Sequence, residues 1–141
     1  MIIAASPWWL HSQLAKDATP VGDLPLSHVL AVNDANFPWV LLVPRRTGAS
    51  EIIDLTEPDQ ARLMTEIARV ASALKSITSC DKLNVAAIGN VVPQLHIHVV
   101  ARRTDDAAWP RPVWGAVPVK PYGAGELEPF IAALQRTVGF A

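Results

Sequence analysis

Two histidines, His96 and His98, are separated by a single residue and follow a glutamine, Gln94. Polar and apolar residues alternate over residues 94–101, which predicts a strand with Gln94, His96 and His98 on one face and apolar side chains on the other. Imidazole is the side chain whose neutral and charged forms coexist near neutral pH, so neighbouring histidines can divide the roles of nucleophile and proton carrier. The spacing therefore predicts nucleophilic or acid–base chemistry on this face.

The same pair has two plainer interpretations. A His-x-His spacing is short enough to arise by chance, so the two side chains can also form a satisfied structural pair. Two histidines on one strand can alternatively bind a metal ion if another strand supplies a third ligand. His28 is the only other histidine on a predicted neighbouring strand, and no acidic residue stands at a suggestive spacing. We therefore expect no protein-held metal, whereas a stoichiometric metal in protein purified without chelator would favour this interpretation.

Three further segments are predicted strands. Residues 28–32 and 39–43 are apolar and flank a turn-forming sequence at residues 33–36, a pattern typical of a hairpin. Their nearly continuous apolar content indicates that both faces of the hairpin are covered. Residues 83–88 predict a strand that ends in a turn at residues 89–90, shortly before the histidine strand.

Helical spacing of apolar residues predicts a long amphipathic helix over residues 57–78, which begins after a capping threonine, Thr56. Short helices are predicted over residues 8–16 and over residues 126–138. The chain from 102 to 122 is rich in proline and tryptophan and predicts an ordered irregular segment. The long helix is the obvious partner for the apolar face of the histidine strand, so the polar face is expected to remain uncovered.

Composition limits the class of protein further. A length of 141 residues predicts a single domain over residues 1–141, and a hydrophobic content of 50% with 18% charged residues excludes a disordered chain. Twelve Lys and Arg against thirteen Asp and Glu give a net charge of −1, which argues against nucleic-acid and membrane-surface partners. No uncharged apolar run approaches the ~20 residues of a membrane span.

The single cysteine, Cys80, excludes an internal disulfide framework and fits a reducing compartment. The first ten residues lack a basic leader and are interrupted by Pro7, so they are not interpreted as a signal peptide. We therefore expect a cytoplasmic protein.

The segment from Leu83 to Arg102 resembles the signature region of the histidine triad (HIT) superfamily. That signature is His-φ-His-φ-His-φ-φ, with φ apolar, preceded by a strand that bears an asparagine and by a turn with a glycine and a polar residue. The similarity covers about residues 20–115 and includes the hairpin, the long helix and a Trp-Pro element. It implies an α+β fold with a mainly antiparallel sheet of about five strands, backed by the long helix and followed by the short C-terminal helix. It also implies a homodimer, which is common in the family.

The resemblance carries catalytic roles onto individual positions. His96 matches the middle histidine of the triad, which in the family is the nucleophile that attacks a nucleotide α-phosphate. His98 matches the last histidine, which helps to bind the phosphate and to organise proton transfer. Gln94 stands at the first triad position as a departure, because glutamine can orient a neighbour or donate to a phosphoryl oxygen but does not titrate near neutrality. Trp39 is a second departure, at a place where many members have an additional histidine.

The resemblance also implies four nucleotide contacts. Asn84 matches an asparagine that helps to hold the phosphates or the ribose, and Gly89 and Asn90 match a turn that approaches the phosphate. Asn33 lies in the hairpin turn, near which the family often has a residue that contacts the ribose. Turn chemistry is the plain structural alternative for Asn90. No cofactor is expected, although Mg²⁺ can accompany the substrate.

The expected function is that of a nucleotide hydrolase or nucleotidyl transferase with a small-molecule substrate and a covalent nucleotidyl-histidine intermediate. Dinucleoside polyphosphates and nucleoside phosphoramidates are the substrate classes that the resemblance implies. The alternative is a nucleotide-binding module with little turnover, because Gln94 and Trp39 depart from the family pattern. Calorimetry with AMP, followed by a turnover assay, would separate the two.

Overall fold

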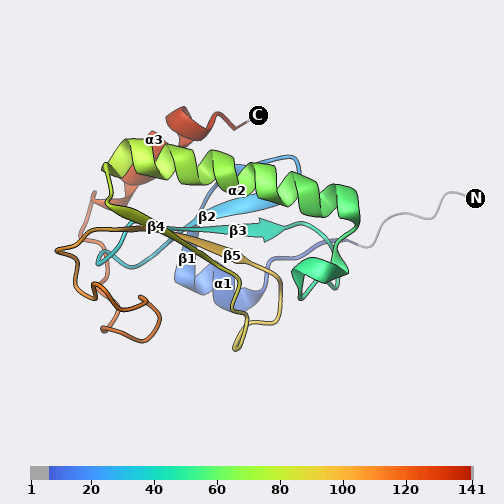
Figure 1. The fold of residues 1–141 in the computed structure, drawn as a ribbon, viewed down its shortest axis with the longest axis horizontal. Coiled ribbons are helices and arrows are strands. Elements are labelled where there is room, and N and C mark those ends of the chain that lie inside the picture. Colours follow the sequence, from blue (N-terminus) through green and yellow to red (C-terminus); the bar gives the residue numbers. More distant parts are fainter. Residues whose placement is uncertain (1–6, 141) are drawn as a thin grey trace, which may run out of the picture.

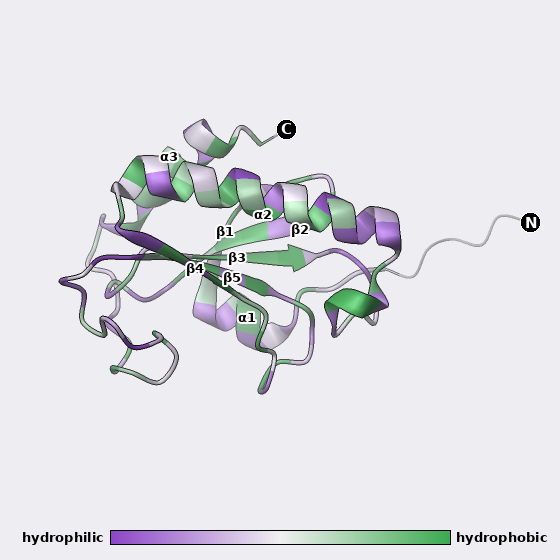
Figure 2. Ribbon diagram, in the orientation of Figure 1, coloured by the Kyte–Doolittle hydropathy of each residue, from purple (hydrophilic) through white to green (hydrophobic). Residues whose placement is uncertain are grey.

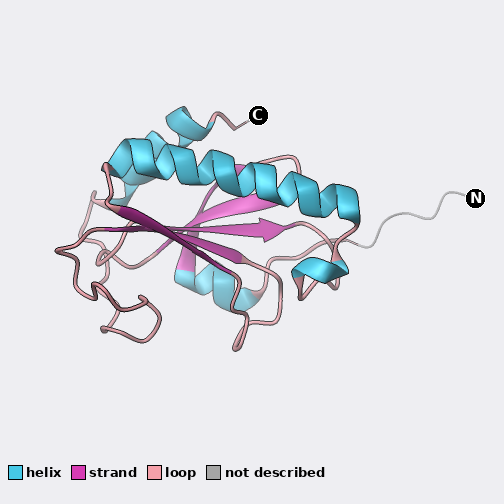
Figure 3. Ribbon diagram, in the orientation of Figure 1, coloured by secondary structure: helices cyan, strands magenta, loops and turns pink. Residues whose placement is uncertain are grey.

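The computed structural model describes residues 7–140 and confirms the α+β architecture, with five antiparallel strands in one open sheet (Figure 1, Figure 3). Residues 1–6 and 141 lie outside the described residues. The expectation that the first ten residues are not a signal peptide therefore rests partly on residues that the structure does not describe. The strand order is β1-β2-β3-β5-β4. The strands are β1 (Ala18–Asp23), β2 (Ser27–Val32), β3 (Trp39–Pro44), β4 (Lys82–Ala86) and β5 (Ile97–Arg102).

β2 and β3 form the predicted hairpin, and their antiparallel register pairs Leu30 with Leu41. β3 pairs in turn with β5, where Leu41 stands opposite His98. Directly opposed residues of antiparallel strands point to the same side of a sheet. Leu30, Leu41 and His98 therefore share one face across three neighbouring strands.

The histidine strand is shorter than predicted, because it begins at Ile97 and not at residue 94. The backbone N–H of Leu95 donates to the carbonyl of Ala49 at 3.0 Å and not to a neighbouring strand. The strand before it, predicted to reach residue 88, ends at Ala86. The loop between β4 and β5 is consequently longer than the expected turn, and it includes the first of the two paired histidines, His96.

β1 is an edge strand that the sequence pattern did not predict. It contains Pro20 and Gly22, which are both unfavourable in the interior of a strand. An edge strand tolerates them because only one side is paired, and the register with β2 shifts between these two residues. The predicted N-terminal short helix is observed as α1 (Ser12–Asp17), where the side chain of His11 accepts a hydrogen bond from the N–H of Gln13.

The predicted long helix is α2 (Glu57–Thr78), which covers one face of the sheet together with α3 (Leu127–Val138) (Figure 1). It begins where Thr56 Oγ1 accepts the N–H of Asp59 at 3.2 Å, and Ser79 directly after it terminates the helix in a left-handed conformation. Figure 2 shows hydrophobic residues concentrated along the strands beneath it. The expected packing of α2 on the apolar side of β5 is confirmed by a core that includes Leu63, Ile67, Val70, Leu74, Ile97 and Val99.

α1 lies on the opposite face of the sheet from α2 (Figure 1). Its Leu14 packs with Leu30, Leu41, Val43 and Val92 in a smaller apolar cluster. A short 3-10 turn, η1 (Ile52–Asp54), precedes α2. Within residues 7–140, none of the helices is long and apolar enough to cross a membrane. α1 covers only part of this second face, and the remainder carries the two histidines.

A buried ion pair joins the end of β5 to the loop that follows. Arg102 is 1% exposed, and its Nε and Nη2 donate to the two carboxylate oxygens of Asp106 at 2.7 and 3.1 Å. Its Nη1 donates to Asn84 Oδ1 on β4 at 2.9 Å, and the guanidinium lies near the rings of Phe37 and Trp109. Burial alone would raise the pKa of Asp106, but hydrogen bonds from Arg102 and three backbone N–H groups lower this pKa to about 2.

Candidate active site

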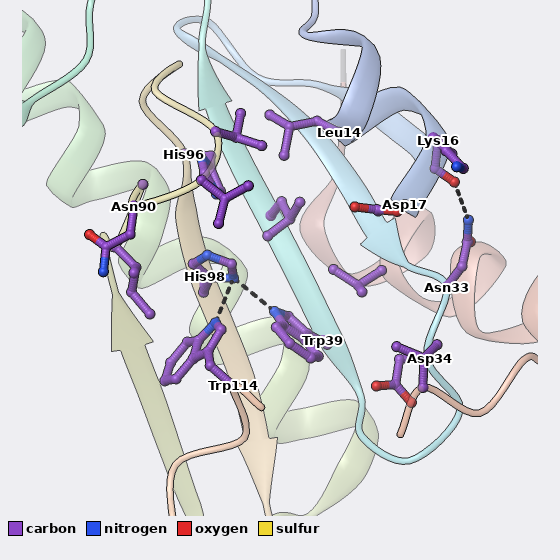
Figure 4. A pocket seen from close by; sticks show the side chains of 17 residues that line it. Leu14, Lys16, Asp17, Asn33, Asp34, Trp39, Asn90, His96, His98 and Trp114 are labelled. Atoms are coloured by element: carbon purple, nitrogen blue, oxygen red, sulfur yellow. Dashed lines mark hydrogen bonds between the residues drawn. The ribbon is translucent and has the colours of Figure 1, made fainter. Parts of the chain in front are cut away.

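A cavity of about 580 Å³ opens on the face of the sheet opposite α2 (Figure 4). Its volume lies within the range of ~300–1,000 Å³ that is usual for small-molecule sites. Most of its wall is apolar, and the polar groups include the two histidines. The lining residues are Leu14, Lys16, Asp17, Val32, Asn33, Asp34, Trp39, Leu41, Ile88, Gly89, Asn90, Val91, Val92, His96, His98, Trp114 and Val119.

His96 reaches the cavity from the residue just before β5. Its Nδ1 lies 2.7 Å from the backbone carbonyl oxygen of Gln94. A carbonyl oxygen only accepts, so Nδ1 of His96 must carry the proton and donate. The lone pair of a neutral His96 ring therefore resides on Nε2, which is the arrangement that a histidine nucleophile requires.

His98 lies on β5 directly beside His96, with the two ring centroids 4.9 Å apart. The side chain is buried, and its Nδ1 lies 3.0 Å from the indole nitrogen of Trp39 and 3.4 Å from that of Trp114. Burial of the ring and, secondarily, the charge of His96 lower the pKa of His98 from its ordinary 6.5 to about 4. His98 is therefore neutral at neutral pH.

This lowered pKa predicts that stability falls as the pH decreases from about 6.5 to about 4. In that window the unfolded chain binds a proton at His98 and the folded chain does not, so protonation favours unfolding. The shift corresponds to a loss on the order of 3 kcal/mol in the free energy of unfolding. Urea denaturation near pH 7 and near pH 4 measures it. Asparagine does not titrate between these pH values, so the His98→Asn variant should lose about 3 kcal/mol less stability than the wild type on this change of pH. Equal losses in the two proteins would contradict the assignment.

The expectation that the Gln94 side chain lies beside those of His96 and His98 is wrong, because this side chain is not part of the cavity lining. Its Oε1 accepts the backbone N–H of His11 at 2.8 Å, and its Nε2 donates to the carbonyl of Trp9 at 2.7 Å. The carboxamide thus binds the segment that leads into α1. Gln94 lies outside β5, so strand alternation does not place its side chain beside those of His96 and His98.

Replacing Gln94 with alanine is expected to loosen residues 8–17 by roughly 1–3 kcal/mol, since two hydrogen bonds of ~0.5–1.5 kcal/mol each are lost. Hydrogen exchange over these residues measures the effect. Gln60→Ala is the matched control, because that side chain also donates to a backbone carbonyl, of Leu55, but lies on α2. Unchanged exchange in the Gln94 variant would show that this attachment does not hold the segment.

The four predicted nucleotide contacts separate into two groups. Asn33, Gly89 and Asn90 line the cavity, with Asn90 on the side of β4 and β5 and Asn33 on the side of β2 (Figure 4). Gly89 has a φ of +66°, which favours glycine in this turn. Asn84 is outside the lining, and its Oδ1 instead accepts the hydrogen bond from Arg102. Its polar partner is thus a structural arginine.

The sequence pattern does not reveal that α1 contributes a wall of the cavity. Leu14, Lys16 and Asp17 line the cavity from this helix, and Trp114 lines it from the loop after β5. A short helix was predicted here, but its position depends on long-range contacts such as the attachment to Gln94. No local pattern reveals such a contact.

The metal interpretation requires a third ligand beside His96 and His98. Within the described range 7–140, no group of three or more His, Cys, Asp or Glu side chains is arranged to hold a metal ion. His28 is not part of the cavity lining, and its Nδ1 instead contacts the carboxylate of Asp23 at 2.5 Å.

An antiparallel five-stranded sheet with a long helix on one face and adjacent histidines on the other defines a protein of the histidine triad class. The family model described as the HIT domain matches residues 13–105. The chain therefore belongs to the HIT family, whose members are commonly nucleotide hydrolases or transferases.

Solved structures agree with this assignment. A histidine triad protein from Bradyrhizobium japonicum is 62% identical with a TM-score of 0.93, covering 94% of this chain and 99% of its own. Histidine triad proteins from Sinorhizobium meliloti and Marinobacter aquaeolei are each 41% identical, with TM-scores of 0.90 and 0.92. The first covers 92% of this chain and 96% of its own, and the second covers 95% and 98%. No curated protein matches the chain.

Proposed function

We propose that the protein is a nucleotide hydrolase or nucleotidyl transferase that acts at the α-phosphate of a nucleotide conjugate, with His96 as the nucleophile. The observation that carries this proposal is the 2.7 Å hydrogen bond from His96 Nδ1 to the carbonyl of Gln94. It keeps the Nε2 lone pair available to a substrate in the cavity. Membership of the HIT family supports the same class of activity.

In the first step, the Nε2 lone pair of His96 forms a bond to the α-phosphorus while the bond from phosphorus to the leaving group breaks. The leaving group departs with that electron pair and takes up a proton from solvent. The ring then carries the nucleotidyl group on Nε2 and a proton on Nδ1, so it is positively charged. The carbonyl of Gln94 stabilises this charge, because hydrogen bonds from charged donors are stronger than those from neutral donors.

In the second step, a water oxygen attacks the phosphorus, and the phosphorus–nitrogen bond returns its electron pair to Nε2. The attacking water releases a proton to solvent, and the nucleotide leaves as the monophosphate. An acceptor other than water makes the same protein a transferase. His98 and backbone N–H groups near Gly89 are the groups that we propose to stabilise charge on the phosphoryl oxygens.

The chemistry of the cavity walls suits a nucleotide. Leu14, Leu41 and Val92 supply an apolar surface of the kind that binds a base, and Asn33 and Asp34 supply polar groups on the β2 side. The cavity thus offers both apolar and polar surface, as the base and the sugar phosphate of a nucleotide require.

A substrate screen with purified protein tests the proposal. The compounds are nucleoside phosphoramidates, dinucleoside polyphosphates and adenylylated compounds, each assayed for release of nucleotide. Acid-labile attachment of labelled nucleotide to His96 is expected with any substrate that is turned over. Failure of every class to react, with AMP nevertheless bound in calorimetry, would instead establish the alternative below.

The alternative is a nucleotide-binding module with little turnover. Two observations favour it, namely that the Gln94 side chain binds the N-terminal segment and that Trp39 contacts His98 at the position of the expected further histidine. Both reduce the number of titratable groups at the site. AMP binding without product release is the result that would distinguish this module from an enzyme.

We also propose that the protein acts as a cytoplasmic homodimer. β4 is an edge strand, and Val85 on this strand and Ile88 just beyond it are 49% and 40% exposed. Apolar side chains beside a free strand edge are typical of surfaces that pair with another chain. Size-exclusion chromatography with light scattering should give twice the monomer mass of 15.2 kDa, and a monomer mass would refute the dimer.

A further inference from the structure

Two tryptophan side chains converge on one ring nitrogen of His98 (Figure 4). The indole Nε1 of Trp39 lies 3.0 Å from His98 Nδ1, and that of Trp114 lies 3.4 Å from the same atom. Trp39 begins β3 and Trp114 lies in the loop after β5, so distant parts of the chain bring them together. Their rings meet edge to face with centroids 6.1 Å apart. Both polar edges nevertheless face one nitrogen, which apolar packing alone does not require.

This convergence determines where the proton of His98 resides. An indole N–H only donates, so Nδ1 of His98 must accept and cannot carry a proton. The proton of the neutral ring then stands on Nε2. His96 has the opposite arrangement, because its Nδ1 donates to a carbonyl. The two adjacent rings therefore carry their protons on opposite nitrogens.

The other neighbours of His98 do not compete for this proton. Leu41 on β3 and Ala86 on β4 stand opposite His98 in the sheet, and neither titrates. His96 is the only titratable side chain in ring contact with His98 in the part of the chain that the structure describes. The charged residues that line the cavity come from α1 and from the turn after β2, across β3 from His98 (Figure 4).

We propose that Trp39 and Trp114 are positioning residues that hold His98 neutral with its proton on Nε2, so that His98 donates a hydrogen bond to a phosphoryl oxygen of the substrate. The identity of that substrate rests on the proposed function, whereas the position of the proton rests only on the hydrogen bonds. His98 then stabilises negative charge without gaining or losing a proton during the reaction.

A neutral His98 also suits the intermediate proposed for its neighbour. The nucleotidyl group on Nε2 of His96 leaves that ring positively charged, and the His98 ring centroid is only 4.9 Å away. A protonated His98 would place a second positive charge beside the first and oppose formation of the intermediate. The two indole donors prevent this, because protonation of His98 at Nδ1 would break both of their hydrogen bonds.

Two-bond ¹H–¹⁵N correlation spectra of protein labelled at histidine nitrogens test the position of the proton directly. From about pH 5 to about pH 8, His98 should show an unprotonated Nδ1 and a protonated Nε2, and His96 should show the reverse at pH values where it is neutral. A proton on Nδ1 of His98, or a charged His98 ring at neutral pH, would overturn the proposal. This measurement needs no substrate, so it is independent of the proposed function.

The variants Trp39→Phe and Trp114→Phe test the role of the tryptophans, because phenylalanine keeps an aromatic ring and removes the N–H. Trp39→Phe should raise the titration midpoint of His98 by about one pH unit and mix its two tautomers. Trp114→Phe should have a smaller effect, since its contact is longer. Trp9→Phe is the control, because that side chain is exposed and should leave His98 unchanged. An unchanged tautomer and midpoint of His98 in the site variants that fold would refute the assignment, and one folded variant is enough for this test.

The donor role has its own readout. Addition of AMP should shift the Nε2–H resonance of His98 in the wild type, and a resonance that stays fixed while His96 responds would overturn this role. For any substrate found in the screen, the acid limb of kcat should move upward in Trp39→Phe together with the titration midpoint. If Trp39 had only a structural role, the substitution would lower the fraction of active protein without moving the acid limb of kcat. Wild-type spectra as expected, without turnover of any substrate, would refute the proposed enzymatic function and leave the tryptophan contacts established.

Discussion

The His96→Ala variant is expected to lose turnover by at least about a thousandfold, because the proposed two-step reaction has no other nucleophile in the right tautomer. The labelled adduct should disappear with it. Binding of AMP should change far less, since the apolar walls and the polar residues on the β2 side remain. Steady-state kinetics, adduct trapping and calorimetry on the same preparation measure the three effects.

His28→Ala provides the matched control for the loss of one histidine. His28 contacts Asp23 and does not line the cavity, so turnover should remain at the wild-type level. Hydrolysis by His96→Ala at the wild-type rate would exclude a covalent mechanism on His96. Loss of AMP binding together with turnover would show that the variant has lost the site and not only the nucleophile.

The largest expected effect on stability comes from Asp106→Ala, which should lose about 3–5 kcal/mol in the free energy of unfolding. The variant leaves the guanidinium of Arg102, which is 1% exposed, buried without its counter-ion. It also removes the acceptor for the backbone N–H groups of Ala108 and Trp109. Urea denaturation at neutral pH measures the loss.

Asp105→Ala is the control for this prediction, because it removes the adjacent carboxylate from the surface. The Asp105 side chain is 83% exposed, and its oxygen lies 3.6 Å from Arg103. Exposed ion pairs contribute about 0–1 kcal/mol, so this variant should remain close to wild type. Similar losses of stability in the two variants would show that the buried ion pair contributes no more to stability than the exposed one.

The parts of the fold that local patterns encode were predictable from sequence. The α2 helix follows from the spacing of its apolar residues and from Thr56, and the hairpin follows from two apolar runs around a turn. β1 was missed because Pro20 and Gly22 oppose strand formation, and only its edge position makes them acceptable. The start of β5 differs from the prediction because alternation of polar and apolar residues continues into residues 94–96, where the backbone N–H of Leu95 bonds to Ala49 and not to a strand.

In the candidate site, too, features encoded by a local pattern were predictable, and features that depend on contacts between distant segments were not. Adjacency of His96 and His98 follows from their spacing, and both line the cavity. The partner of Asn84 could not be predicted, because Arg102 reaches it across the strand pair. The contacts of Trp39 and Trp114 with His98 join positions far apart in the chain, so no single segment contains the pattern.

The contact that orients His96 has a consequence for how position 94 can vary. Its acceptor is a main-chain oxygen, which every amino acid at that position supplies equally. A substitution at position 94 therefore keeps this acceptor, and the Gln94 side chain is available for a different contact. In this chain that contact holds the segment before α1, a helix that lines the cavity, so the side chain at position 94 affects the cavity wall and not the tautomer of His96. The family is named for three histidines, but this architecture uses the side chains of two.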